Sequence, residues 1–342
     1  KQRQLIRLGA QLVRKAADEE APPEHLIEQV AGDLSHLAQG HKRKGLEHVH
    51  DVAHEAYTRM LEKVEGRGAT GLRVGFSRLD GITQGFQPGQ LIILAARPGI
   101  GKTALALNWA LRSAVYQGAH VAFFSLEMSK EEVFNRMLSA HASVNMKAVL
   151  AGAFDEQIHA RILAARDELV QRPIYICDQA TLTTRELTAM VDRHLTQLNA
   201  RLDMVVVDYL QLMSSPSDSR AAKQSEAVRV GEISRAFKLL AKDRGIPVVV
   251  LSQLNRDVEH RQGGRPQLSD LRDSGAIEQD ADMVMFIHRK MRPALEGEPE
   301  DRSAELVLAK HRNGPVGIVP LHFEAEFARY REMERTTADD GL

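Results

Sequence analysis

One stretch decides the fold of this chain: Ala95-Ala96-Arg97-Pro98-Gly99-Ile100-Gly101-Lys102-Thr103. The apolar run 91–94 precedes it and an Ala/Leu-rich segment follows it, so the pattern predicts a buried strand, a glycine turn and a helix. Phosphate-binding loops have this layout, because glycines let backbone N–H groups face a phosphate and the helix N-terminus adds positive potential. The residues predicted to bind a nucleotide are Arg97, Pro98, Gly99, Ile100, Gly101, Lys102, Thr103 and Ala104.

Two side chains of this loop have expected roles of their own. Lys102 is placed to reach the β- and γ-phosphates, and the Thr103 hydroxyl is placed to bind Mg²⁺. The match to the pattern G-x-x-x-x-G-K-[ST] is incomplete, because Ala96 stands where the first glycine belongs. The alternative is a chance Gly-Lys-Thr in an ordinary strand–helix turn, and the strand and helix on either side favour nucleotide binding.

The composition limits the classes of protein to which the chain can belong. With 342 residues, 43% hydrophobic and 27% charged, it is long enough for one large α/β domain and an accessory element. The single cysteine, Cys177, excludes an intramolecular disulfide. No apolar run approaches the ~20 residues that span a bilayer, so we expect a cytoplasmic protein with no membrane partner. The net charge of −1 means that any nucleic-acid-binding surface must be local.

The chain divides into two parts of different character. Residues 1–65 have helical periodicity and no strand-like run, and Gly45–Glu65 forms an amphipathic pattern bounded by glycines. The glycine-rich segment Gly66–Gly71 is typical of a flexible boundary. We therefore predict a helical linker segment over 1–65 and a large α/β domain over 66–342.

After the boundary, apolar runs alternate with helical patterns. Most runs are continuous Val/Ile/Leu blocks, which are typical of central strands covered on both faces. The runs are Leu91–Ala95, His120–Ser125, Ile174–Cys177, Met204–Asp208, Val248–Ser252, Met283–Ile287, Glu305–Ala309 and Ile318–Leu321. The last ones lie close together, as antiparallel hairpins do. The predicted fold class is α/β, a doubly wound and mostly parallel sheet.

Polar residues lie at or just after the ends of three of these predicted strands. Asp208 ends one strand and is predicted to hold Mg²⁺ opposite Thr103. Glu127 follows another, which we expect one strand over from the phosphates, and it is predicted to orient or deprotonate the attacking water. Gln253 is predicted to sense the γ-phosphate. The alternatives are a loop cap for Asp208 and a favourable first-turn helix charge for Glu127.

Two loops are predicted to touch a polyanion. The segment 255–275 is long and contains Arg256, Arg261, Arg265 and Arg272 among glycines and a proline. The segment 214–220, which ends in Arg220, follows the Asp208 strand. Loops of this composition grip a phosphate backbone without reading bases. The alternative is a pair of solvated surface loops.

Six motifs occur in one order along the chain: 96–103 Ala-Arg-Pro-Gly-Ile-Gly-Lys-Thr, 125–128 Ser-Leu-Glu-Met, 208–213 Asp-Tyr-Leu-Gln-Leu-Met, 252–256 Ser-Gln-Leu-Asn-Arg, 270–282 Asp-Leu-Arg-Asp-Ser-Gly-Ala-Ile-Glu-Gln-Asp-Ala-Asp and 310–315 Lys-His-Arg-Asn-Gly-Pro. As a set they closely resemble the C-terminal motor domain of the DnaB-type replicative helicases, a RecA-like family. The resemblance covers about Gly71 to Phe323. It implies a ring-shaped homohexamer that hydrolyses ATP with Mg²⁺ between subunits, encircles single-stranded DNA and separates a duplex at the replication fork.

The resemblance also implies roles for particular residues. Lys310 and Arg312 would reach the γ-phosphate of a neighbouring subunit as a trans-acting arginine finger. The DNA-contacting residues would be Arg272, Asp273, Gly275, Arg256 and Arg220, the first three on a loop lining the central channel. Primase and a helicase loader are the further partners implied.

This sequence departs from the family pattern in two places. The channel loop usually reads Arg-Glu-Ser-Gly, and Asp273 stands here in place of the glutamate. The separate N-terminal collar domain of the family is not found in this sequence. The segment before Gly66 resembles the connecting linker instead, and Gly45–Glu65 is predicted to be the helix that docks on the adjacent motor domain.

Two other functions are compatible with a RecA-like ATPase. One is a recombinase, or a related DNA-dependent ATPase, that forms filaments on DNA without unwinding it. The other is a nucleotide-gated scaffold that binds DNA statically. A motor is expected to couple DNA binding to rapid ATP turnover, whereas a scaffold is not.

Overall fold

The computed structural model describes residues 9, 48–50, 53, 57, 58, 60, 61, 71–152, 155–197, 201–213, 226–261, 263–271, 275–289 and 301–333. The chain forms two compact units, one of Lys1–Ala69 with Ala189–Asn199 and one of Thr70–Thr188 with Ala200–Leu342. Most of the predicted linker segment lies outside the described residues, and of the docking helix only residues 48–50, 53, 57, 58, 60 and 61 are described. The predicted site residues all belong to the second unit, and the following description concerns that unit.

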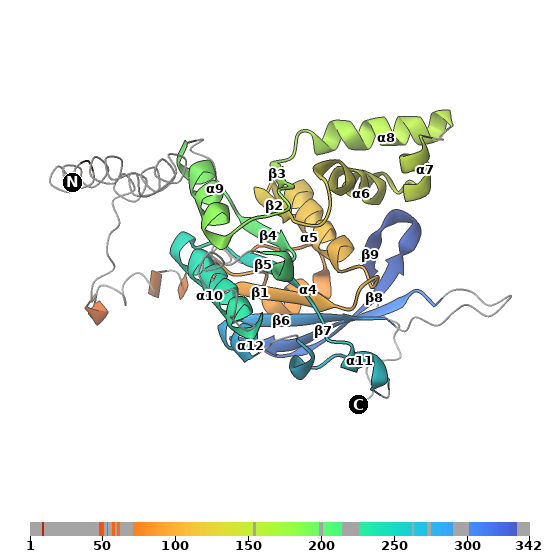
Figure 1. Cartoon of the computed structure of the whole chain (residues 1–342). Helices are drawn as coiled ribbons and strands as arrows, with labels where there is room; N and C mark the ends of the chain where they lie inside the picture. The colour runs from red at the N-terminus through yellow and green to blue at the C-terminus, as the bar shows by residue number, and fades with distance from the viewer. Residues whose placement is uncertain are drawn as a thin grey trace, which may run out of the picture. The chain divides into compact units, whose positions relative to one another are not determined.

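Within the described residues, nine strands form one sheet in the order β3-β2-β4-β5-β1-β6-β7-β8-β9 (Figure 1). The strands are β1 Leu91–Ala96, β2 Val121–Ser125, β3 Ile174–Cys177, β4 Met204–Asp208, β5 Val248–Gln253, β6 Met283–His288, β7 Ser303–His311, β8 Gly317–Glu324 and β9 Arg329–Glu332. Every apolar run predicted as a strand forms one. β9 was not predicted.

The sheet has a parallel and an antiparallel part. β3, β2, β4, β5, β1 and β6 are parallel to one another, and β7, β8 and β9 continue the sheet as antiparallel hairpins. The predicted doubly wound, mostly parallel sheet is thus confirmed. One expectation was wrong: β4 and β5 lie between β2 and β1, so Glu127 is not one strand over from the phosphate loop. Sequence order does not reveal the order of parallel strands, because crossover helices can carry the chain past its neighbours.

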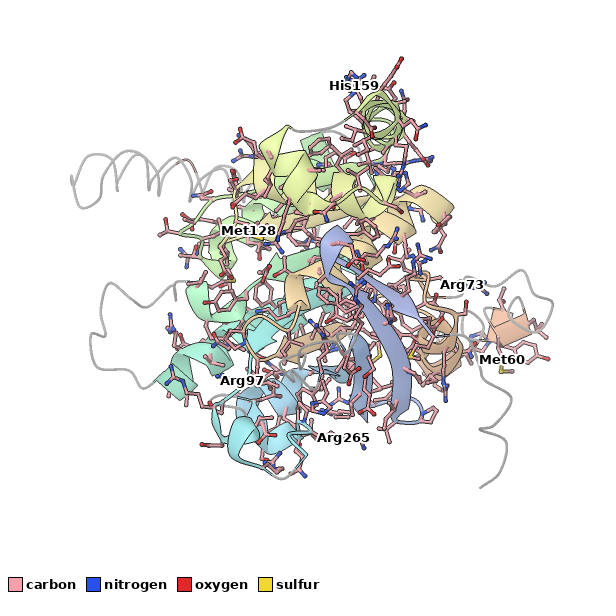
Figure 2. The ribbon with its side chains drawn as sticks, turned by 90° about the vertical axis from the view of Figure 1, so that its right-hand side faces the viewer. Met60, Arg73, Arg97, Met128, His159 and Arg265 are labelled. Atoms are coloured by element: carbon pink, nitrogen blue, oxygen red, sulfur yellow. The ribbon has the colours of Figure 1, made fainter. Side chains whose placement is uncertain are left out.

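The helices are α4 Ser77–Thr83, α5 Lys102–Gln117, α6 Lys130–Ala142, α7 Met146–Ala151, α8 Glu156–Leu169, α9 Thr184–Gln197, α10 Glu226–Arg244, α11 Asp257–His260 and α12 Gly275–Asp280, with short 3₁₀ turns η1 Leu210–Leu212, η2 Leu268–Asp270 and η3 Ala325–Phe327. The Ser129 hydroxyl accepts from the Glu132 N–H at 3.2 Å and the Glu132 carboxylate accepts from the Ser129 N–H at 2.9 Å. This reciprocal cap makes α6 begin at Lys130. Figure 1 shows α6, α7 and α8 gathered beyond β2 and β3, and Figure 2 shows His159 of α8 far from Arg97 and Arg265.

The alternation of side chains along β1 separates the two faces of the sheet. Ile92 and Leu94 point to the face on which α5 packs, and they share one apolar cluster with Trp109 and Leu105 of that helix. The intervening residues of β1 are equally buried on the opposite face, against which α10 packs. Because both faces are covered, β1 is buried along its whole length. No described helix is long and apolar enough to cross a membrane.

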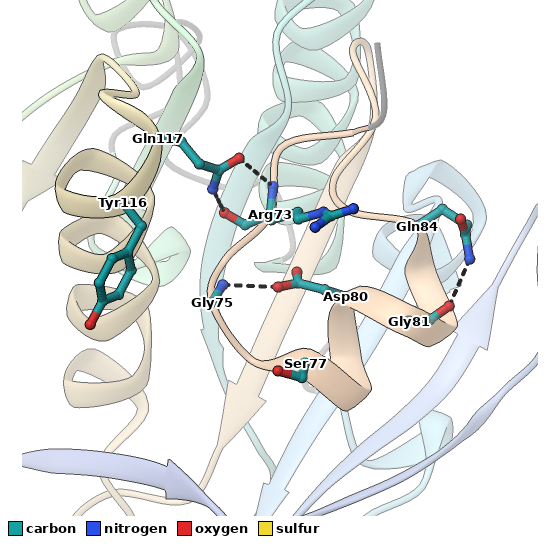
Figure 3. Close-up of a pocket in the computed structure, with 8 residues that line it drawn as sticks. All are labelled: Arg73, Gly75, Ser77, Asp80, Gly81, Gln84, Tyr116 and Gln117. Carbon is teal, nitrogen blue, oxygen red and sulfur yellow. Dashed lines mark hydrogen bonds between the residues drawn. The ribbon is translucent and has the colours of Figure 1, made fainter. Parts of the chain in front are cut away.

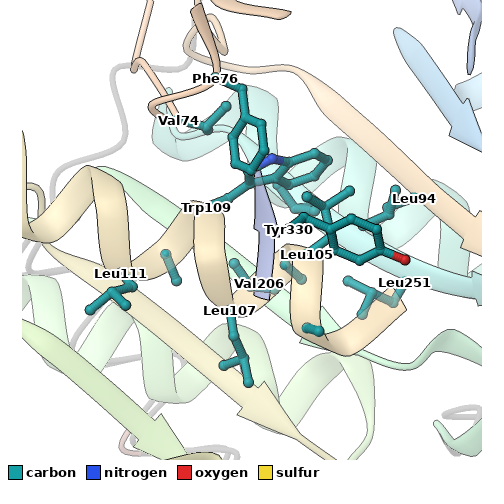
Figure 4. Packing of buried hydrophobic residues seen from close by; sticks show 14 of the residues in the cluster. Val74, Phe76, Leu94, Leu105, Leu107, Trp109, Leu111, Val206, Leu251 and Tyr330 are labelled. Carbon is teal, nitrogen blue, oxygen red and sulfur yellow. The ribbon is translucent and has the colours of Figure 1, made fainter. Parts of the chain in front are cut away.

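Trp109, the only tryptophan, lies at the centre of the α5 face (Figure 4). Its ring and that of Phe86 form a T-shaped pair, with the ring centroids 5.3 Å apart and the planes at 84°. Phe86 in turn pairs with Leu72 in an isolated β-bridge. This packing joins the segment that enters the domain to the helix that follows the phosphate loop.

We predict that Phe86→Ala lowers the free energy of unfolding by about 3–5 kcal/mol, because it removes a fully buried ring and leaves a cavity beside Trp109. Urea unfolding followed by Trp109 fluorescence measures this change. Tyr116→Ala is the control, since Tyr116 is 72% exposed and its removal is expected to cost less than about 0.5 kcal/mol. Equal effects of the two substitutions would contradict the assignment of this core.

Candidate nucleotide-binding site

The predicted phosphate loop joins the end of β1 at Ala96 to the start of α5 at Lys102. Gly99 and Gly101 have φ values of 77° and 103°, which L side chains rarely adopt. Ile100 between them is buried, with 7% of its surface exposed, and anchors the loop in the core. The strand, glycine turn and helix predicted from the sequence therefore form a single continuous element.

Asp208, at the end of β4, lies against the first turn of α5. Its Oδ2 accepts from the Thr103 hydroxyl at 2.6 Å, and its Oδ1 lies 3.7 Å from the Lys102 ammonium. The Asp208 side chain is fully buried, and Oδ1 has no hydrogen-bond partner among the described residues. A buried carboxylate oxygen without a donor is costly, so it fits a position where a cation or its water ligand completes the contacts.

Lys102 is held in a largely buried position. Burial lowers the pKa of its ammonium group, and the negative charges of Asp208 and Glu127 offset part of that effect. The Tyr209 ring lies beneath the ammonium, with 4.2 Å between the nitrogen and the ring centroid. Burial also raises the pKa of Tyr209, and the charges of Glu127 and Asp208 raise it further. Phosphate oxygens are the kind of ligand that such a desolvated ammonium group attracts.

Glu127 is exposed at the end of β2, in a turn that its neighbours fix. The Ser125 hydroxyl donates to the Met128 carbonyl at 2.7 Å and accepts from the Met128 N–H at 3.1 Å. The Leu126 N–H donates to the Asp208 carbonyl at 2.7 Å, so the ends of β2 and β4 are tied together. Although two strands separate β2 from β1, Glu127 still acts electrostatically on Lys102. The reason is that β2 and β4 are neighbours and Asp208 lies beside the loop helix.

Gln253 ends β5 directly beside the loop, because it pairs with Ala96 of β1. The Arg97 guanidinium donates to the Leu254 carbonyl at 2.8 Å and joins the loop to the segment after β5. Gln211 bridges the next gap: its amide donates to the Ser252 hydroxyl at 2.9 Å and its oxygen accepts from the Gln253 N–H at 3.4 Å. The ends of β4, β5 and β1 are thus linked by side chains.

The segment after β5 is more internally paired than its composition suggested. Arg261 forms two hydrogen bonds with Asp270, at 2.6 and 2.8 Å, and Arg265 forms a paired contact with Glu305. Burial by itself would raise the pKa of Asp270, but the hydrogen bonds from Arg261 and the Gln267 N–H hold it below its usual value. Arg261 therefore pairs within the segment, and Arg265 joins the segment to β7.

The predicted DNA-contacting residues are only partly within the described chain. Arg256 is exposed at the start of α11, and Gly275 begins α12. Arg272, Asp273 and Arg220 lie outside the described residues. The structure therefore describes two of these five residues, Arg256 and Gly275.

Lys310 and Arg312 lie on and just after β7, at the far end of the parallel strands from the loop. The Arg312 guanidinium, whose side chain is 54% exposed, lies 3.4 Å from Asp282. Asp282 also accepts from the N–H of Leu91, the first residue of β1. Since β1 has six residues, the loop at its other end is about 17 Å away. Arg312 is therefore remote from the phosphate loop of its own chain.

Lys310 makes a different set of contacts. Its ammonium donates to the carbonyls of Glu278 and Ala281, near the C-terminal end of α12. Such a cation at a helix end satisfies carbonyls that have no partner within the helix. Burial lowers the pKa of Lys310, and the nearby Arg312 charge lowers it further. Of the two predicted finger residues, Arg312 is the more exposed.

A hollow of about 570 Å³ lies elsewhere, beside α4 and the last turn of α5 (Figure 3). Its walls include Arg73, Asp80, Gln84, Tyr116 and Gln117. The polar groups largely bond to one another: Asp80 accepts from the Gly75 N–H at 2.9 Å, and Gln117 bonds to the Arg73 backbone. Because α5 has 16 residues, this hollow is about 20 Å from the phosphate loop and belongs to a different region.

Three residues near the site were not singled out from the sequence. Tyr209 and Gln211 directly follow Asp208 in the stretch Asp-Tyr-Leu-Gln, so their position after a predicted strand end was the available signal. Tyr330 of β9 contacts the loop from 230 residues away, and no local pattern indicates such a contact.

The sequence and the fold both have known counterparts. Residues 71–332 match the DnaB-like helicase C terminal domain family. The chain is 37% identical to the replicative DNA helicase DnaC of Bacillus subtilis (strain 168), over 99% of this chain and 74% of that protein. It is 42% identical to the replicative DNA helicase DnaB of Leifsonia xyli subsp. xyli (strain CTCB07), over 82% of this chain and 61% of that protein.

Two solved structures share the fold. The ATPase domain of G40P superposes with a TM-score of 0.74 at 34% identity, covering 82% of this chain and 98% of that domain. A DnaB-like replicative helicase, solved in a study of its interactions with primase, superposes with a TM-score of 0.78 at 29% identity, covering 97% of this chain and 76% of that one. The family match spans most of the chain and contains every strand of the described sheet. The chain therefore belongs to the DnaB-like replicative DNA helicases, a family of enzymes that use nucleoside triphosphates.

Proposed function

We propose that this chain is a helicase motor that hydrolyses ATP at the interfaces of a homohexameric ring, moves along single-stranded DNA and unwinds duplex DNA at the replication fork. One observation carries the proposal. Lys102, Asp208 and Gln253 lie together at the carboxyl ends of the parallel strands, while Arg312 lies exposed at their amino ends. One chain does not bring these groups together. A second copy, packed with its Arg312 against the loop of the first, completes the site.

Each residue at the loop has a role in this proposal. The loop N–H groups and Lys102 bind the phosphates, and Glu127 accepts a proton from the attacking water. Gln253, whose N–H is held by Gln211, responds to the γ-phosphate and passes its presence to the segment after β5. The exposure of Glu127 leaves it accessible to a water molecule between subunits.

Magnesium fits the residues beside the loop. Asp208 offers a buried oxygen without a hydrogen-bond donor among the described residues, and the Thr103 hydroxyl lies against the same carboxylate. Hard oxygen ligands of this kind suit Mg²⁺, which usually keeps several of its waters. The ion, when bound, neutralises charge on the phosphates.

We predict that Asp208→Asn abolishes the difference in ADP affinity between Mg²⁺ and EDTA, because it keeps the side-chain size and removes the charge that holds the ion. Isothermal titration calorimetry with ADP in each buffer measures this difference. Asp203→Asn is the matched control, since Asp203 immediately precedes the opposite end of β4. A difference in affinity that survives in Asp208→Asn would show that Mg²⁺ is held elsewhere.

The proposed interface also assigns the finger residues. Arg312 reaches the γ-phosphate of the neighbouring subunit, and Lys310 supports the turn that carries Arg312 by holding α12. The amphipathic segment 45–65 docks on the adjacent motor domain and strengthens the ring. An arginine supplied in trans stabilises the charge that develops during phosphoryl transfer.

DNA and protein partners complete the proposal. Single-stranded DNA lies in the channel against Arg272, Asp273 and Gly275, with Arg256 and Arg220 as further phosphate contacts. Primase is proposed as a partner because a similar replicative helicase was solved in a study of its interactions with primase. A helicase loader is proposed on the family resemblance alone.

We predict that Lys102→Ala and Glu127→Gln each reduce ATP turnover by at least about 100-fold, since one removes phosphate binding and the other removes the proton acceptor. Both variants should also fail to separate a forked DNA duplex that the unaltered protein unwinds with ATP. A fluorescence-based unwinding assay and phosphate release measure the two activities. Strand pairing without unwinding by the unaltered protein would favour a recombinase, and little DNA-stimulated turnover would favour a static scaffold.

We predict that the Arg312→Ala variant has little ATP turnover by itself and regains part of it when it is mixed with the Lys102→Ala variant. In a mixed ring, a Lys102→Ala subunit still provides Arg312, and an Arg312→Ala subunit still provides the loop. Phosphate release by each variant and by the mixture measures this complementation. Arg331→Ala is the control, because its side chain is also 54% exposed and pairs with Glu324 within its own chain. No recovery in a mixture that forms hybrid rings would contradict action in trans.

A further inference from the structure

The phosphate loop is supported by a residue that lies 230 positions further along the chain. Tyr330 of β9 is 1% exposed, and its hydroxyl donates to the carbonyl of Ile100 inside the loop. The Arg289 guanidinium, just after β6, donates to the same carbonyl at 3.3 Å. Two donors, one in β9 and one just after β6, therefore hold one loop oxygen.

The orientation of this carbonyl determines where the next N–H points. In a planar trans peptide, the C=O of Ile100 and the N–H of Gly101 point in opposite directions. When Tyr330 holds the carbonyl toward the core, the Gly101 N–H faces away from the core, which is the direction required to bind a phosphate. Glycine at φ 103° places little steric limit on this peptide, so the orientation depends on what the carbonyl contacts.

Tyr330 is itself firmly positioned (Figure 4). Its backbone N–H donates to the Asn108 side chain in α5 at 2.7 Å. Its ring lies against Phe323 with 4.6 Å between ring centroids, and Arg289 covers the same phenylalanine at 4.2 Å. Burial raises the pKa of the Tyr330 hydroxyl, so it remains a proton donor at neutral pH. The contact is therefore part of a packed cluster and not a mobile side chain at the surface.

The fit between Tyr330 and the loop leaves no room for a side chain. A Cβ on Gly101 would lie 3.0 Å from the Tyr330 oxygen and 3.2 Å from its ring. Glycine at this position is thus required both by its φ value and by the approach of the tyrosine. The loop and β9 form one closely fitted unit.

We propose that Tyr330 is a positioning residue for nucleotide binding: its hydroxyl sets the orientation of the Ile100–Gly101 peptide and so aims the Gly101 N–H at the phosphate. The inference rests on the proposed role of the loop and adds a residue of the C-terminal hairpin to it. Because this N–H would contact the phosphate before and during the reaction alike, its loss weakens binding more than it slows chemistry.

Tyr330→Phe tests the proposal, since it removes only the hydroxyl and keeps the ring. The expected result is a KM for ATP about tenfold higher, with kcat changed less than about twofold, as follows from the loss of one hydrogen bond that acts on binding. Steady-state phosphate release gives both constants, and urea unfolding followed by Trp109 fluorescence establishes that the variant is folded in the assay. Tyr175→Phe is the control, because its hydroxyl lies 3.5 Å from His120 at the start of β2, away from the loop.

Three outcomes would overturn the inference: an unchanged KM, a fall in kcat that parallels the loss of stability, or failure of Tyr330→Phe to fold, which would make the hydroxyl a requirement of folding. Lys102→Ala separates this result from failure of the proposed function. If Lys102→Ala keeps its turnover, the loop is not the ATP site and the proposed function fails. If Lys102→Ala is inactive and Tyr330→Phe has an unchanged KM, only the role of Tyr330 is rejected.

Discussion

The buried carboxylate of Asp208 is the interaction on which the site depends. A fully buried negative charge must be balanced by nearby cations and donors, because burial removes its hydration. Lys102 and Thr103, at the start of α5, provide that balance, and they hold the first turn of the helix against the end of β4. The same contacts leave one oxygen of Asp208 without a hydrogen-bond donor among the described residues. The Asp208 carboxylate therefore both holds α5 against β4 and serves as the proposed metal ligand.

The two ends of the parallel sheet have different partners. At the carboxyl end of β1, the loop meets Gln253 and the Tyr330 hydroxyl. At the amino end, Asp282 accepts from the Leu91 N–H and pairs with Lys238 and Arg312. One buried strand thus connects the proposed phosphate site with the proposed finger. In the proposed ring, this strand runs between the two interfaces of one subunit.

Much of the fold could be predicted because its signals are local. The continuous apolar blocks identified the inner strands, and the glycine turn before Lys102 identified the start of α5. β9 was missed because Arg-Tyr-Arg-Glu has one apolar residue, Tyr330, and pairs on one side only, at the edge of the sheet. Arg261 was counted as a basic loop residue, and its pairing with Asp270 depends on the path of a loop that sequence periodicity does not describe. The positions of Arg272, Asp273 and Arg220 stay predictions.

The sequence by itself determined the strand–loop–helix around Lys102, the mostly parallel sheet and the polar residues at the strand ends, because hydrophobic periodicity and glycine placement act over a few residues. Only the tertiary structure decided that β4 and β5 lie between β2 and β1, that Arg312 is at the opposite end from the loop, and that Tyr330 holds the Ile100 carbonyl. These features depend on contacts between segments up to 230 residues apart, and such contacts leave no local pattern in the sequence. The strand order and the long-range hydrogen bonds, more than the motifs, explain how the phosphate loop is held.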